Sequence, residues 1–106
     1  MDMAADRENR NAVQQGQQLS FRLYVVRSAP NSARAIANLH TLGREWLGGR
    51  YEVEIVDVLE APLRALQDQI IVTPTLIRLS PPRCVIVGNL SDIPAVAQAL
   101  GLDVGS

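Results

Sequence analysis

The stretch Ile70-Ile71-Val72-Thr73-Pro74-Thr75-Leu76 joins two apolar runs through a single proline. Proline cannot donate a hydrogen bond to a sheet, so it is tolerated at the first residue of a strand, at an edge or at a bulge. Thr73, the residue before it, is pushed away from helical backbone angles. We therefore expect a strand to begin at Pro74. Because a cis X-Pro bond costs little, two interpretations stay open: a plain junction between loop and strand, or a cis-proline beside a binding surface.

A strand, a helix and a second strand are expected before this stretch. Residues 21–26 are rich in β-formers and apolar on both faces, which is typical of a strand with parallel neighbours. A helix should follow, capped by Asn31 and ended by Gly48-Gly49. Its apolar stripe consists of Ala35, Ile36, Leu39, Leu42 and Trp46, whereas His40 and Arg44 fall off this stripe and should face solvent. Residues 51–59 then read as a second strand, parallel to the first.

A short helix, a hairpin and a last helix complete the expected order. Proline at position 62 suits a first helical turn, with Leu63, Leu66 and Ile70 at inward spacing. The β-runs 75–79 and 84–87 flank the breaker 80–83 and predict a hairpin. Ser91 should cap a final helix whose inward residues are Ile93, Val96, Ala97 and Leu100. The pattern predicts one α/β domain of order βαβαββα over residues 20–103, after a flexible polar tail over residues 1–19.

Composition narrows the classes of function. The chain has 106 residues, 47% of them hydrophobic, which suits one domain with one core. A net charge of −1 argues against binding of nucleic acid or of anionic membranes. One cysteine, Cys84, allows neither an internal disulfide nor a CxxC redox pair, and it fits a reducing, cytoplasmic setting. No run is long enough to cross a membrane.

No catalytic, cofactor or metal site is predicted. His40 has no second ligand at suitable spacing, and Cys84 among apolar neighbours is interpreted as a small core residue. Arg34 could support a partner surface or could simply be solvated. Asp57, near the end of a buried strand, is expected to bond to a helix terminus or a loop, because an unpaired interior carboxylate is costly.

The predicted order, with Thr73-Pro74 before the third strand, resembles the thioredoxin fold. The stretch Ser28–Ser32, where thioredoxins carry their redox motif, contains no cysteine, so dithiol exchange at that place is excluded. A more specific pattern consists of several blocks in a fixed order: Leu23-Tyr24-Val25, Pro30–Ala35, Tyr51 with Ile55–Leu59, Asp68, Thr73–Leu76, Pro81-Pro82 and Gly88–Asp92. In these blocks the chain resembles the KaiB family.

The resemblance implies a non-enzymatic clock or timing adaptor that binds a KaiC-type ATPase ring, with KaiA or a sensor kinase as further partners. It implies a contact surface formed by Asn31, Arg34, Glu52, Glu54, Thr73 and Pro74. It also implies two folds: a monomeric thioredoxin-like state and a homotetrameric ground state of order βαββααβ. The two differ from about residue 61 onward, with Pro74, Pro81, Pro82 and Gly88 at the hinges.

Family members often carry a lysine at the position of Glu54 and a basic pair where this chain has Arg83-Cys84. Two alternatives stay open beside the clock adaptor. One is a stress-response binding module with another partner. The other is a thioredoxin-like redox or glutathione-transfer enzyme, which the missing CxxC disfavours.

Overall fold

The observed order of elements is βαβαββα, as predicted. The computed structural model describes residues 18–102. The strands are β1 (Leu19–Val25), β2 (Tyr51–Asp57), β3 (Thr75–Arg78) and β4 (Cys84–Val87), and the helices are α2 (Pro30–Leu47), α3 (Pro62–Gln67) and α4 (Ile93–Ala99). Most of the predicted tail, residues 1–17, and the predicted last domain residue, 103, lie outside this range.

The four strands form one mixed sheet of order β2-β1-β3-β4. β1 pairs with β2 in parallel over seven residues, from Leu19↔Tyr51 to Val25↔Asp57. The helix that connects them, α2, supplies the crossover that a parallel pair requires. β3 lies antiparallel to both β1 and β4, and the hairpin between β3 and β4 was predicted from the breaker at residues 80–83.

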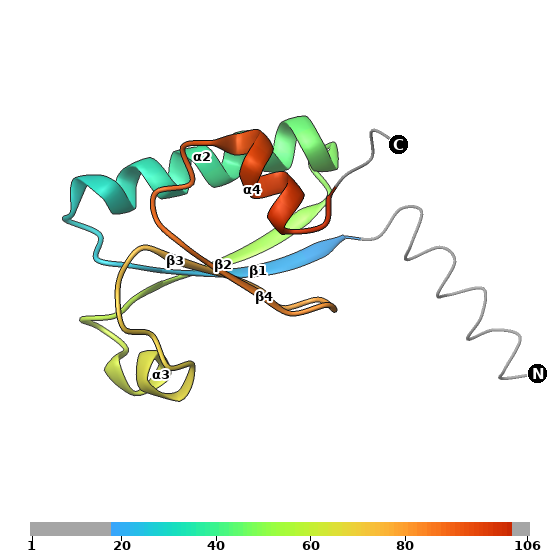
Figure 1. Cartoon of the computed structure of the whole chain (residues 1–106). Helices are drawn as coiled ribbons and strands as arrows, with labels where there is room; N and C mark the ends of the chain where they lie inside the picture. The colour runs from blue at the N-terminus through green and yellow to red at the C-terminus, as the bar shows by residue number, and fades with distance from the viewer. Residues whose placement is uncertain (1–17, 103–106) are drawn as a thin grey trace, which may run out of the picture.

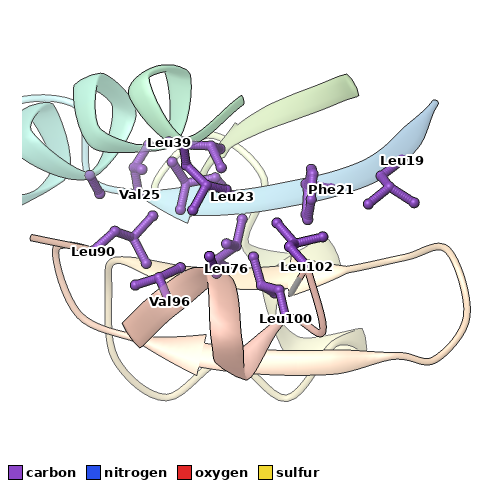
Figure 2. Packing of buried hydrophobic residues seen from close by; sticks show 13 residues of the cluster. Leu19, Phe21, Leu23, Val25, Leu39, Leu76, Leu90, Val96, Leu100 and Leu102 are labelled. Carbon is purple, nitrogen blue, oxygen red and sulfur yellow. The ribbon is translucent and has the colours of Figure 1, made fainter. Parts of the chain in front are cut away.

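The helices cover the two faces of the sheet unequally. α2 and α4 lie over one face, and the short α3 lies on the other (Figure 1). Because side chains alternate along a strand, Phe21, Leu23 and Val25 of β1 point toward α2 and α4, whereas Tyr24 points toward α3. Figure 2 shows the larger cluster, with Leu39 of α2 and Leu100 after α4 directed toward these β1 side chains.

The two predicted N-caps differ from the observed ones, by two residues for α2 and by one residue for α4. α2 begins at Pro30 with Ala29 as N-cap, because proline is suited to the first helical position and needs no hydrogen-bond acceptor there. Asn31 therefore lies inside the helix. α4 is capped by Asp92, whose carboxylate accepts a hydrogen bond from the backbone of Ala95 at 3.2 Å, and not by Ser91. The predicted end of α2 is confirmed, since Gly48 has the left-handed φ of 59°.

Two predicted orientations were wrong. Leu63 and Leu66 of α3 are 71% and 72% exposed, because the helix presents Ala65 to the sheet instead. His40 does not face solvent freely: its Nδ1 lies 2.6 Å from the hydroxyl oxygen of Tyr51 and the ring is half-buried. Helical spacing alone cannot distinguish the two sides of a helix that has only six residues.

Candidate binding surface

The predicted contact residues Asn31, Arg34, Thr73 and Pro74 gather at one end of the sheet. The Thr73-Pro74 bond is cis. A cis bond was required by the interpretation of this stretch as a cis-proline beside a binding surface. The backbone N–H of Gly88 donates to the carbonyl of Pro74 at 2.9 Å, which places the residue after β4 beside this proline. Asn31 Oδ1 accepts from Arg34 Nη1 at 3.2 Å and from the Asn89 amide at 3.4 Å. The start of α2 is thus linked to the β4–α4 connection next to Pro74.

The other predicted contact residues lie elsewhere. Glu52 and Glu54 are exposed on β2, the strand at the far edge of the sheet from β4. Pro81 and Pro82 form the turn of the β3–β4 hairpin, at the end of β3 opposite to Pro74. The structure therefore divides the predicted set into a group around Pro74, an acidic edge and a distant turn.

Glu54 belongs to an ion-pair network that fastens α3 to the sheet. Arg64 of α3 forms a bidentate pair with the Glu54 carboxylate, with both N···O distances at 2.7 Å. Arg22 Nε donates to Glu54 Oε1 at 3.0 Å from the neighbouring strand β1. Hydrogen bonds from Arg64 and Arg22 lower the pKa of Glu54 to about 2. The charge-assisted pair of Arg64 thus holds α3 against β2, and the contact of Arg22 links β2 to β1.

Asp68, directly after α3, is the second member of this network. Its Oδ2 accepts from the Tyr24 hydroxyl at 2.6 Å and from Arg22 Nη1 at 3.0 Å. The hydrogen bond from Tyr24, followed by that from Arg22, keeps the pKa of Asp68 below its usual range. Burial, and then the contact with Asp68, raises the pKa of Tyr24. A fully buried phenol therefore ties the end of α3 to β1.

The segment between β2 and β3, which includes α3, exposes several large apolar side chains. Five large side chains between β2 and β3 are between 48% and 91% exposed: Leu59, Leu63, Leu66, Ile71 and Val72. We call these five residues the α3 surface. They lead directly into Thr73-Pro74. Ile71 and Val72 also line a groove of about 340 Å³ together with Val85 and Val87 of β4. Clustered exposed apolar side chains of this kind are typical of surfaces that bind other proteins.

Arg78 is a structural residue that the sequence analysis missed. It is only 8% exposed, and its guanidinium donates to the carbonyl oxygens of Ser80 at 3.0 Å, of Pro81 at 2.9 Å and of Leu100. It thereby joins the hairpin turn to the C-terminal end of α4. Nothing in the local pattern of residues 75–79 distinguishes this arginine from a solvated one.

Asp57 and Cys84 have the roles expected of them. The Asp57 carboxylate accepts from the backbone of Leu59 at 2.8 Å and of Arg27 at 3.1 Å, and these bonds lower its pKa. Cys84 packs against the larger cluster, and its thiol lies 3.4 Å from the carbonyl oxygen of Ala99. Within residues 18–102, no helix combines the length and apolar character needed to cross a bilayer.

A model of the KaiB domain matches residues 22–102. The circadian clock protein KaiB3 of Synechocystis sp. is 47% identical over 85 residues, which cover 79% of this chain and 81% of that protein. The circadian clock oscillator protein KaiB of Gloeothece citriformis is 42% identical, over 79% of this chain and 78% of its own.

Solved structures agree with the fold. The N-terminal domain of Synechococcus elongatus SasA has a TM-score of 0.58 at 22% identity, covering 83% of this chain and 88% of that domain. Mitochondrial thioredoxin 3 of Saccharomyces cerevisiae has a TM-score of 0.63 at 16% identity, covering 90% and 87%. At these identities the likeness concerns the fold alone, and it confirms the thioredoxin-like prediction.

Proposed function

The chain belongs to the KaiB family, and on that premise we propose that it is a non-enzymatic timing adaptor that binds a KaiC-type ATPase ring. The relatives that match it are named as circadian clock proteins. A protein that binds a partner needs apolar side chains that are exposed to solvent and that do not pack within its own fold. The α3 surface, next to Thr73-Pro74, is the single observation that carries the proposal.

Several features make the α3 surface suitable for docking. Ile71 is 91% exposed and Leu63 is 71% exposed, so each would lose most of its hydration on contact with a partner. The ion pairs of Arg64 and the bond between Tyr24 and Asp68 hold α3 in place before binding. A surface that is already ordered costs less conformational entropy on binding than a flexible one.

The proposal is tested by the double variant Leu63→Gln/Leu66→Gln in a binding assay with a cognate KaiC-type ATPase. We expect at least a tenfold loss of affinity, equivalent to about 1.4 kcal/mol, because two exposed leucines no longer enter the interface. The matched control is Ala37→Gln/Ala99→Gln, which changes exposed positions on α2 and α4. Equal affinity of both variants and the unchanged chain would contradict a role of α3, and no complex after long incubation would contradict the proposed function itself.

We further propose that residues 61–100 exchange with a second arrangement, of order βαββααβ. What supports this, besides the family, is that the apolar side chains of this half are incompletely buried in the observed fold: Val85 and Val87 of β4 are 53% and 60% exposed. A segment that leaves apolar side chains exposed loses less buried surface when it repacks into another arrangement. Pro74, Pro81, Pro82 and Gly88 are the proposed hinges. Backbone NMR would show two sets of resonances for this half, whereas one set under all conditions would contradict the exchange.

The family further suggests an oligomeric state, additional partners and a set of contact residues, and we propose these for this chain as well. The second arrangement would form a homotetramer, the thioredoxin-like one would bind the ring, and KaiA or a sensor kinase would be a further partner in the cytoplasm. Asn31, Arg34, Glu52 and Glu54 are the proposed contacts beside Thr73 and Pro74. Charge reversal at Arg34 and, separately, at Glu52 should weaken the binding of different partners, because the two residues lie in separate parts of the molecule. Identical effects on every partner would contradict this division.

A further inference from the structure

The contacts that attach α3 to the rest of the domain are mostly polar. Only one of its six residues is buried. Arg64 pairs with Glu54 of β2 at two N···O distances of 2.7 Å. Asp68, directly after the helix, accepts hydrogen bonds from Arg22 and Tyr24 of β1 at 3.0 and 2.6 Å. We call these five residues, Arg22, Tyr24, Glu54, Arg64 and Asp68, the α3 network.

The α3 network joins the part of the chain that the proposed exchange leaves unchanged to the part that rearranges, residues 61–100. Within residues 18–102, the ion pairs that connect these two parts are Arg64–Glu54 and Arg22–Asp68. β3 and α4 also belong to the rearranging part, but both are attached through buried side chains of the larger apolar cluster. The attachment of α3 therefore depends more on charge than that of β3 or α4.

The geometry of the α3 network requires a helical turn between Arg64 and Asp68. The backbone N–H of Asp68 donates to the carbonyl of Arg64 at 3.1 Å, so the two residues lie one turn apart. The Tyr24 hydroxyl, which donates to Asp68 at 2.6 Å, lies 3.1 Å from the same carbonyl oxygen. In a strand, residues four positions apart are separated by about 13 Å, and one hydroxyl cannot contact both. Because the order βαββααβ has a strand directly after its second strand, the α3 network cannot form there as it does in the observed fold.

We propose that the α3 network selects the thioredoxin-like arrangement over the second one, because only the former pairs these charges as observed. This inference rests on the exchange proposed above. A contact that is made in one arrangement and lost in the other shifts the equilibrium between them by its own free energy. The side chains of Arg64 and Glu54 are 41% and 46% exposed, so solvent screening limits the shift from this pair to about fivefold.

The first test measures the ratio of the second arrangement to the first in the full chain, from the two sets of amide resonances of residues 61–100. Protein concentration is held constant, because the second arrangement is proposed to be a tetramer. We expect Glu54→Lys to raise this ratio about fivefold or more, since it loses the pair with Arg64 and brings like charges together. The matched control is Glu45→Lys, the same substitution at an exposed position of α2, which covers the opposite face of the sheet (Figure 1). This control should leave the ratio unchanged.

An exchange of the two charges tests whether their pairing is responsible. Glu54→Lys/Arg64→Glu restores a pair of opposite charges between β2 and α3, and it should move the ratio back toward that of the unchanged chain. No recovery in the double variant, or equal ratios in Glu54→Lys and Glu45→Lys, would overturn the selection by the α3 network and leave the exchange itself in place. If none of these chains shows a second set of resonances, the exchange and the selection are both overturned.

Salt distinguishes a contribution of charge from one of packing. Raising sodium chloride from about 50 mM to about 500 mM shortens the screening length from about 14 Å to about 4 Å and weakens ion pairs that are partly exposed. We expect the ratio to rise about twofold more in the unchanged chain than in Glu54→Gln, which keeps the size of the side chain without its charge. Equal salt dependence of the two chains would overturn a selection that acts through charge.

Discussion

The two halves of the domain differ in the length of their helices and strands and in the exposure of their apolar side chains. Residues 19–57 consist of two strands of seven residues and a helix of 18, whereas the elements of residues 58–102 have between four and seven residues each. All seven exposed large hydrophobic side chains of the described range belong to the second half. The first half therefore buries its large apolar side chains within the fold, and the second half leaves part of them exposed.

This difference indicates which half contributes most of the stability of the core. β1 is central, pairs with β2 over seven residues and with β3 over four, and contributes Leu23 and Val25 to the core. α3 contributes one buried residue, Ala65, and is held mainly by polar contacts. Polar contacts are directional and individually weak, whereas a well-packed core resists rearrangement. The second half is thus the part in which the proposed binding and rearrangement should cost least.

The largest expected effect is in the core of the first half. Leu39→Ala removes a side chain that is 1% exposed and should lower the free energy of unfolding by about 2–5 kcal/mol, from lost burial and the remaining cavity. Urea denaturation at neutral pH measures this. Leu39→Met is the control that conserves volume, and it should cost less than about 1.5 kcal/mol. A loss below 1 kcal/mol for the alanine variant would mean that the first half is not the rigid one.

The link between the halves should give the next largest effect. Tyr24→Phe deletes the hydroxyl that donates to Asp68 at 2.6 Å and leaves this acceptor short of a partner, at a cost of about 1–3 kcal/mol. Tyr51→Phe is the matched control, because its hydroxyl contacts His40 at a half-buried position. Denaturation followed by circular dichroism measures both variants. A larger loss for Tyr51→Phe would contradict the role assigned to the Tyr24–Asp68 contact.

Acid should weaken the attachment of α3. The pKa of Glu54 is depressed from 4.5 to about 2 in the folded protein, so its stabilisation is fully present above pH 4.5 and is lost as the pH falls toward 2. Since the carboxylate is 46% exposed, solvent screening limits the effect to about 1 kcal/mol or less. Unfolding at several pH values should show this slope, reduced in Glu54→Gln. An unchanged slope in that variant would assign the pH dependence to other groups, with Asp68 the first candidate.

The smallest expected effect is on the α3 surface itself. Leu63→Ala and Leu66→Ala remove side chains that are more than 70% exposed, so each should change the free energy of unfolding by no more than about 0.5 kcal/mol. The same denaturation series measures both. A cost above 1.5 kcal/mol would show that these leucines contribute to the core, as their spacing first indicated.

Much of the fold followed from sequence because its signals were local. The proline at position 74, the breaker at residues 80–83 and Gly48-Gly49 each mark a boundary that backbone sterics impose. The βαβ unit followed from length and periodicity. What local signals could not supply was the orientation of α3, since Leu63 and Ala65 compete for the sheet and only tertiary packing decides between them.

The contacts that the candidate surface residues make within the fold could not be predicted, for a related reason. Asn31 and Thr73 lie at one end of the sheet, whereas Glu54 is paired with Arg64 and Arg22. Residue types predict that an acid can form a pair; they do not predict which arginine reaches it across two elements. The buried Arg78 was missed because its acceptors are backbone carbonyls, which every sequence offers.

Native-state hydrogen exchange, followed by NMR at low protein concentration, tests the division into two halves most directly. Amides of β1 and α2 should exchange only through global unfolding, whereas those of α3, β4 and α4 should exchange through a shared opening of lower free energy. Amides at Leu23 and Leu39 would then report the full stability, and those at Ala65, Ile86 and Ala97 a smaller one. One common free energy of opening for both groups of amides would contradict the division into two halves.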